Sequence, residues 1–185
     1  MTVLIVGGSK SGKSSLAQNV CAGLAGDGPL YYLATMIPQD GEDEARIARH
    51  IEDRAGMGFE TLEQGRNLTA VLSRAEKNGT FLLDSVTALL SNEFFPREKN
   101  YEPDPASGQR VAEDICTLSR QVRNLVVVAD DLFRDAARYD PVTQSYRKAL
   151  ADILRRVARE ADTVAEMAMG NLTVFKGGDL KCFCG

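Results

Sequence analysis

Short apolar runs alternate with amphipathic segments along the chain. The runs are rich in β-branched or aromatic residues, which is typical of strands buried in a parallel sheet. They are residues 3–6, 30–34, 80–84 and 124–129. The segments whose hydrophobic positions have a helical period are residues 15–20, 43–54, 111–122 and 143–161. Because strands and helices alternate, the sequence predicts an α/β fold with a mainly parallel sheet flanked by helices.

Further segments complete the pattern. Residues 163–168 and 171–175 are predicted to pair as two closing strands. A helix is expected from Asn67 onward, because asparagine is common at helix N-caps. Residues 96–108 hold three of the six prolines, and we interpret them as a surface loop within a single P-loop α/β domain over residues 1–185.

The composition suits a globular domain and excludes two classes of protein. With 185 residues, 44% of them hydrophobic, the chain can bury a sizeable core. The net charge is −4, so no basic field favours nucleic acid. No apolar run approaches the roughly 20 residues that span a membrane. The first strand begins at residue 3 and leaves no room for a signal peptide, so we expect a cytoplasmic protein.

The four cysteines are interpreted as free thiols, because disulfides are rare in a reducing compartment. Cys182 and Cys184 form a C-x-C pair near the end of the chain. A structural metal site there would need a second pair of ligands. We therefore expect a frayed C-terminal tail rather than a metal centre.

A phosphate-binding loop follows the first predicted strand. Its sequence, GGSKSGKS, matches the pattern G-x-x-x-x-G-K-[ST]. Such a loop wraps around an anion with its backbone N–H groups pointing inward, and the following helix adds its positive N-terminal end. We expect Lys13 to reach the β and γ phosphates of a nucleotide and the Ser14 hydroxyl to hold Mg²⁺. The candidate nucleotide-binding residues of the loop are Gly7, Gly8, Ser9, Lys10, Ser11, Gly12, Lys13 and Ser14.

An acid at the end of another strand is expected to complete the Mg²⁺ site. Asp84 ends the run at residues 80–84 and is the first candidate. Asp130 and Asp131, which follow the run at residues 124–129, are its competitors. Parallel strands present their carboxyl ends at one edge of the sheet, so all three acids are expected at that edge.

His50 is the only histidine and lies in the amphipathic segment 43–54. An imidazole nitrogen can carry a phosphoryl or nucleotidyl group as a covalent intermediate. Arg46 and Arg54 lie four residues to either side, so on a helix both guanidiniums would flank the imidazole and recognise phosphate. A solvated surface histidine is the alternative that this spacing leaves open.

Several motifs follow one another over residues 1 to about 95. They are the loop Gly7–Ser14, the strand end Tyr32-Leu33-Ala34-Thr35, the acids Asp40 and Glu42, the segment Arg46-Ile47-Ala48-Arg49-His50 with Arg54, the element Thr61-Leu62-Glu63, and Asp84-Ser85-Val86-Thr87 with Ser91-Asn92. In their order and nearly constant spacing they resemble those of the bifunctional adenosylcobinamide kinase/adenosylcobinamide-phosphate guanylyltransferase family of cobalamin biosynthesis.

The resemblance implies a RecA-like fold and homotrimers in which the site lies close to a neighbouring subunit. It implies a kinase step on adenosylcobinamide, with GTP or ATP and Mg²⁺. It also implies that GTP guanylylates His50, and that the GMP then passes to adenosylcobinamide phosphate. The nucleotide contacts that it implies outside the loop are Leu33, Ala34, Thr35, Ile51, Glu52, Asp53, Arg54, Glu63 and Asp84.

The second half departs from the family's pattern. Where the family has a glycine-rich stretch after its fourth strand, residues 130–138 contain no glycine, so we expect this segment to follow a different path. The family's F-R-D signature appears only as Tyr146-Arg147-Lys148. A P-loop regulatory protein and a kinase for another small metabolite are the alternative functions. The intact His50 favours the transferase, because a regulatory switch needs no nucleophile.

Overall fold

The computed structural model describes residues 1–38 and 41–183, except for the side chains of residues 42, 46 and 53. Some of the residues singled out above therefore lie outside this description. They are the side chains of Arg46, Asp53 and Glu42, together with Asp40 and Cys184.

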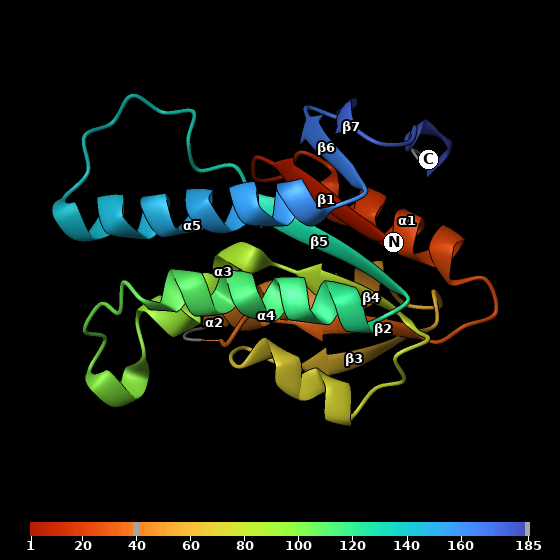
Figure 1. Cartoon of the computed structure of the whole chain (residues 1–185), viewed down its shortest axis with the longest axis horizontal. Helices are drawn as coiled ribbons and strands as arrows, with labels where there is room; N and C mark the ends of the chain where they lie inside the picture. Colours follow the sequence, from red (N-terminus) through yellow and green to blue (C-terminus); the bar gives the residue numbers. More distant parts are fainter. Residues whose placement is uncertain (39–40, 184–185) are drawn as a thin grey trace.

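A seven-stranded sheet runs through the centre of the molecule (Figure 1). Its strands are β1 (Thr2–Gly7), β2 (Leu30–Ala34), β3 (Phe59–Glu63), β4 (Thr80–Asp84), β5 (Asn124–Asp130), β6 (Thr163–Ala168) and β7 (Asn171–Lys176). Their order across the sheet is β3-β2-β4-β5-β1-β6-β7. All neighbours are parallel except β7, which runs antiparallel to β6 at one edge. The mainly parallel sheet predicted from the alternation of elements is confirmed.

The α-helices are α1 (Lys13–Ala25), α2 (Gly41–Asp53), α3 (Val86–Phe94), α4 (Ser107–Gln121) and α5 (Pro141–Glu160), and three 3₁₀ turns are η1 (Leu68–Ser73), η2 (Arg97–Lys99) and η3 (Lys181–Phe183). Helix α1 packs on one face of the sheet, where Val20 and Val128 belong to one apolar cluster. Helices α3, α4 and α5 cover the other face, where Leu83 and Val127 are buried (Figure 1). Both faces of β5 are thus covered, which explains its uninterrupted apolar run. Within the described residues, no helix is long and apolar enough to cross a membrane.

Two local elements differ from the sequence-based expectations. Strand β3 is not evident in the sequence, because Leu62 is its one buried residue and the strand lies at the sheet edge. A helix does begin after Asn67, but it is the six-residue 3₁₀ helix η1. The side-chain cap expected from Asn67 is absent, because this residue has a φ of 50° and its side chain accepts no cap hydrogen bond. Leu68 and Val71 are the buried residues of η1, and their spacing of three matches its three residues per turn.

The C-terminal tail is docked rather than frayed, so that expectation is wrong for the described residues. Leu180 is only 3% exposed. The Asn19 side-chain amide of α1 donates a hydrogen bond to the carbonyl of Phe183 at 3.0 Å. The Phe183 ring lies against Gly23, where an added Cβ would come within 2.2 Å of the ring. A glycine on α1 therefore makes room for an aromatic side chain 160 positions later in the sequence.

Replacing Phe183 by alanine is expected to lower the free energy of unfolding by about 1–2 kcal/mol, since a half-buried ring loses its contacts with α1. Phe175 is 67% exposed on the edge strand β7 and serves as the matched control. Its replacement by alanine should change the free energy of unfolding by less than about 0.5 kcal/mol. Urea unfolding of both variants measures the difference. Equal effects of the two substitutions would contradict the docking of the tail.

Candidate active site

The phosphate-binding loop connects β1 to α1 as predicted. At two of its positions the local geometry favours glycine over any residue with a Cβ atom. Gly12 is the N-cap of α1 with a φ of 95°, a conformation that favours glycine. At Gly7, an added Cβ would lie 2.5 Å from the carbonyl oxygen of Met167 on β6. Because Gly12 makes no side-chain cap, the first N–H groups of α1 are available to an anion.

The hairpin of β6 and β7 supports this loop. The N–H of Gly170, in the hairpin turn, donates to the carbonyl of Ser11 at 3.2 Å. The Ser11 hydroxyl is buried and has no hydrogen-bond partner among the described residues. Lys10 has a φ of 57°, so a residue other than glycine occupies the left-handed region at the tip of the loop. The loop is therefore held from the side of β6.

Lys13 is paired with Asp130 at the end of β5. The Lys13 Nζ lies 2.8 Å from Asp130 Oδ1 and donates to the carbonyl of Gly8 at 3.1 Å. Asp130 is placed there by the sheet, since it is the register partner of Gly7 in the β1–β5 pair. In this structure, the lysine expected on the phosphates is thus bound to a carboxylate of the same site.

The end of β5 is held by a second set of contacts. The Asp130 N–H donates to the Thr87 hydroxyl at 3.0 Å, and the Tyr146 hydroxyl donates to the Thr87 carbonyl at 2.9 Å. Burial, together with the negative charge of Asp130, raises the pKa of Tyr146 well above its ordinary value. The phenol therefore stays protonated and remains a donor.

A cavity of about 590 Å³ opens beside the loop, between the carboxyl ends of the strands and α2. Its volume falls within the range of roughly 300–1,000 Å³ that is typical of small-molecule sites. It brings together residues that were predicted separately from the sequence: Lys13, Ser14, Ala34, His50, Ile51, Arg54, Glu63 and Asp84. It also contains Asp130, the competitor of Asp84.

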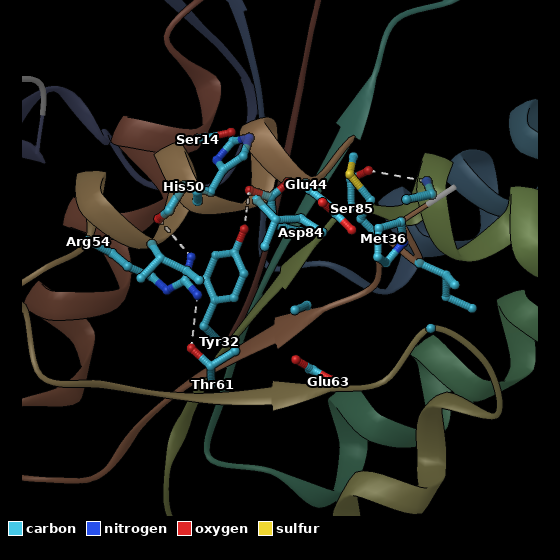
Figure 2. Close-up of a pocket in the computed structure, with 18 of the residues that line it drawn as sticks. Ser14, Tyr32, Met36, Glu44, His50, Arg54, Thr61, Glu63, Asp84 and Ser85 are labelled. Atoms are coloured by element: carbon cyan, nitrogen blue, oxygen red, sulfur yellow. Dashed lines mark hydrogen bonds between the residues drawn. The ribbon is translucent and has the colours of Figure 1, made fainter. Parts of the chain in front are cut away.

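Arg54 fixes the position of His50, but not in the way its spacing suggests. Its guanidinium donates to the His50 carbonyl at 2.7 Å and to the Thr61 hydroxyl at 2.9 Å (Figure 2). It also stacks over the ring of Tyr32, 4.0 Å from the ring centroid, and is 7% exposed. The expectation that Arg54 flanks the imidazole is therefore wrong, because this residue follows the last turn of α2 and turns toward the sheet.

His50 itself lies in the last turn of α2 and lines the cavity. Its Nδ1 atom is buried and has no hydrogen-bond partner among the described residues. A buried polar atom without a partner is costly unless a ligand satisfies it. The arrangement thus suits a group that reacts with, or binds to, a molecule in the cavity.

Asp84 is linked to Arg54 through Tyr32. The Tyr32 hydroxyl donates to Asp84 Oδ2 at 3.1 Å, on the ring whose face carries Arg54 (Figure 2). The next residue, Ser85, is held by Thr35, whose hydroxyl donates to the Ser85 carbonyl at 2.9 Å and accepts from its N–H at 2.7 Å. Tyr32 therefore connects the carboxylate of β4 to the arginine that holds His50.

Some of the residues predicted to contact the nucleotide do not line the cavity. Leu33 and Thr35 are fully buried, and their side chains do not line the cavity. Glu52 is exposed on α2 and does not line it either. Tyr32 does line it and was missed, although its position two residues before Ala34 places both on one face of β2.

The side chains fit a magnesium ion bound together with a nucleotide. Among the described residues, no group of three histidine, cysteine or acidic side chains could hold a metal. Mg²⁺ usually takes one or two protein ligands and obtains the others from phosphates and water. Ser14, Asp84 and Asp130 line one cavity and can supply such ligands. Cys182 is an exposed free thiol, and its C-x-C partner Cys184 lies outside the described residues.

Comparison with known sequences gives one family for most of the chain. The family model described as cobinamide kinase / cobinamide phosphate guanyltransferase matches residues 3–174, which include the divergent second half. The chain is similar to the bifunctional adenosylcobalamin biosynthesis protein CobU of Salmonella typhimurium, with 28% identity over 174 residues, 89% of this chain and 93% of that protein. It is 42% identical over 95 residues to the bifunctional adenosylcobalamin biosynthesis protein CobP of Pseudomonas aeruginosa, covering 50% of this chain and 52% of that protein.

Comparison with solved structures concerns the fold. A solved structure described as an ATPase domain matches with a TM-score of 0.57 and 11% identity, covering 96% of this chain and 77% of that one. At this identity the similarity extends to the fold alone. The predicted RecA-like P-loop fold is thereby confirmed.

Replacing Asp130 by asparagine is expected to tighten the binding of Mg²⁺-free GTP by roughly 5- to 10-fold. The substitution frees Lys13 and removes a negative charge that faces the phosphates, in a site that is only partly screened by solvent. Isothermal titration calorimetry in the presence of EDTA measures the affinity. The matched control is Asp131→Asn, since Asp131 pairs with Arg134 outside the cavity. An unchanged or weaker affinity of the Asp130 variant would show that this carboxylate does not compete for the lysine.

Replacing Asp84 by asparagine tests the other carboxylate. The amide can still accept from Tyr32 but loses the charge that attracts the metal, so the Mg²⁺ concentration needed for tight nucleotide binding should rise about tenfold. Affinity for Mg²⁺-free nucleotide should stay within about twofold. A Mg²⁺ titration with a fluorescent GTP analogue gives both values. If Asp130→Asn shifts the metal requirement more than Asp84→Asn does, Asp130 is the anchor and the assignment to Asp84 is wrong.

Proposed function

Because the chain belongs to the cobinamide kinase / cobinamide phosphate guanyltransferase family, it is an enzyme of cobalamin biosynthesis, and we propose that it performs two reactions. It phosphorylates adenosylcobinamide and then transfers GMP from GTP to adenosylcobinamide phosphate. His50 carries the GMP between the two molecules.

One observation carries the assignment of His50. Its imidazole has a buried nitrogen without a partner among the described residues, in the same cavity as Lys13, Ser14 and Asp84. The nitrogens of a histidine on a solvated helix surface would be hydrated, whereas Nδ1 of His50 is buried and the residue lines the same cavity as the phosphate-binding loop. The cavity therefore supports a nucleophile next to the expected position of the phosphates.

The guanylyl transfer takes two displacements at phosphorus. In the first, an imidazole nitrogen of His50 attacks the α-phosphorus of GTP, a P–N bond forms, the bond to the β-phosphate oxygen breaks, and pyrophosphate leaves. In the second, a phosphate oxygen of adenosylcobinamide phosphate attacks the same phosphorus. The new P–O bond forms as the P–N bond breaks, which restores the free histidine.

The surrounding residues bind and orient the reactants. The loop Gly7–Ser14, with Lys13, binds the phosphates and stabilises the pyrophosphate that leaves. Lys13 must exchange Asp130 for the phosphates to do so. Arg54 holds the backbone of His50, which limits the reorientation that the attack requires. Mg²⁺, which Ser14 and Asp84 would hold, neutralises charge on the phosphates when it is bound.

The remaining features of the proposal rest on the resemblance. Further nucleotide contacts come from Ala34, Ile51 and Glu63, which line the cavity. The phosphoryl donor of the kinase step is GTP or ATP. The protein acts in the cytoplasm, where these nucleotides are available, and it forms homotrimers, which light scattering coupled to size-exclusion chromatography would detect.

Replacing His50 by asparagine is expected to abolish covalent labelling by GTP that carries a labelled α-phosphate. Asparagine has no nucleophilic nitrogen, whereas nucleotide affinity should stay within about threefold and the free energy of unfolding within about 1 kcal/mol. Acid-labile label retained on the denatured protein is the readout. The control is Arg49→Gln, an exposed neighbour on α2. Full labelling of the His50 variant would refute the mechanism, and bound nucleotide without labelling of the wild type would favour a regulatory protein.

A further inference from the structure

A second hollow, of about 380 Å³, lies beside the active-site cavity and shares Ile37 with it. It is formed by the segment after β2, the end of α3 and the loop that contains η2. Asn92, Phe95, Arg97 and Tyr101 are the lining residues that matter below. We call this hollow the side groove.

The wall between the two spaces is fixed by close contacts. Gly65 lines the active-site cavity, and an added Cβ there would lie 2.5 Å from Cγ1 of Ile37. The Asn92 side-chain amide donates to the carbonyl of Thr35 at 2.8 Å and to the carbonyl of Gly65 at 2.9 Å. The side groove is therefore built onto the same strand ends that form the active site.

The two arginines of the side groove differ in their partners, because among the described residues one is paired with acidic side chains and the other is not. Arg66 pairs with Glu98 at 2.5 Å and lies 3.8 Å from Glu93. The Arg97 side chain is exposed and makes no ion pair or hydrogen bond within the part of the chain that the structure describes. Its guanidinium is thus an available donor at the rim of the groove.

Aromatic side chains form the apolar part. Phe95 stacks on Tyr146 and makes an edge contact with Phe94, so one side of its ring is held in place. Tyr101 is 47% exposed, in a backbone conformation with a φ of 61°. Flat apolar surfaces next to a free donor suit a ligand that is itself flat and apolar but carries polar acceptors.

We propose that the side groove binds the corrin macrocycle of adenosylcobinamide and of its phosphate. The inference rests on the proposed function and adds a substrate subsite to it. Arg97 donates to an amide carbonyl at the rim of the macrocycle, and Phe95 and Tyr101 contact its apolar surface. The arm that ends in the reacting hydroxyl or phosphate passes over Ile37 into the active-site cavity.

Size and continuity favour this occupant. The active-site cavity has the volume of a site for one small ligand, and a nucleotide fills such a space. A macrocycle that reacts with that nucleotide must lie outside the cavity but next to it. The side groove lies outside the cavity and is next to it, because Ile37 lines both spaces.

The two half-reactions test the proposal separately. Arg97→Ala and Tyr101→Ala should leave labelling of His50 by GTP within about twofold, because this step needs no corrinoid. Each should raise the KM for adenosylcobinamide phosphate in the transfer step about tenfold, and Tyr101→Phe should restore it. Equilibrium dialysis of adenosylcobinamide against nucleotide-free protein should show a matching loss of affinity. Arg159→Ala, an exposed arginine in the last turn of α5, is the control.

The outcomes separate this inference from the proposed function. An unchanged KM and an unchanged corrinoid affinity in both variants would overturn the side groove as a subsite, even if labelling and transfer proceed normally. Loss of labelling with unchanged corrinoid affinity would also overturn it, because the residues would then serve the nucleotide. Absence of labelling in the wild type would instead refute the histidine mechanism, while the dialysis result would still decide the side groove.

Discussion

Arg54 ties the helix that carries His50 to the sheet that carries Asp84. Its guanidinium binds the His50 carbonyl and the Thr61 hydroxyl and stacks on Tyr32, whose own hydroxyl binds Asp84. A buried guanidinium with all these partners is costly to displace. Without Arg54, the end of α2 would lose its hydrogen bonds to the carboxyl edge of the sheet. His50 would then no longer be held in the position that lines the cavity. The geometry of the active site therefore depends on a residue that a reader of the sequence would take for a phosphate ligand.

The Lys13–Asp130 pair is positioned by the sheet and not by the segment that follows β5. Residues 130–138 contain no glycine, and the segment after β5 is exposed and held by ion pairs. Arg134 contacts both Asp131 and Glu166, and the Arg147 guanidinium lies 3.3 Å from the Asp135 carboxylate. Asp130 nevertheless stays next to Lys13, because the β1–β5 register fixes it. In the absence of phosphate, the carboxylate neutralises the lysine within a partly buried site. Nucleotide binding must then replace one anion by another, which makes the affinity sensitive to this single carboxylate.

Much of the fold could be predicted because its signals are local. Buried strands such as β5 are continuous apolar runs, and the loop after β1 has an unmistakable pattern. Strand β3 could not be found, because an edge strand with one buried residue has no hydrophobic signature. The tail that docks on α1 could not be found either, since the match between Gly23 and Phe183 connects distant parts of the sequence. For the site, residue types and spacing selected His50 and Asp84, but the direction of Arg54 depends on where α2 ends relative to the sheet.

The central claim is that His50 forms a covalent bond to GMP. Mass spectrometry of peptides from protein incubated with GTP and Mg²⁺, digested under alkaline conditions that preserve P–N bonds, tests it most directly. The account predicts a GMP adduct on the peptide that contains His50, which disappears when adenosylcobinamide phosphate is added before digestion. A GMP adduct on Lys13 or on any other residue, or continued transfer of GMP with no adduct at all, would contradict it.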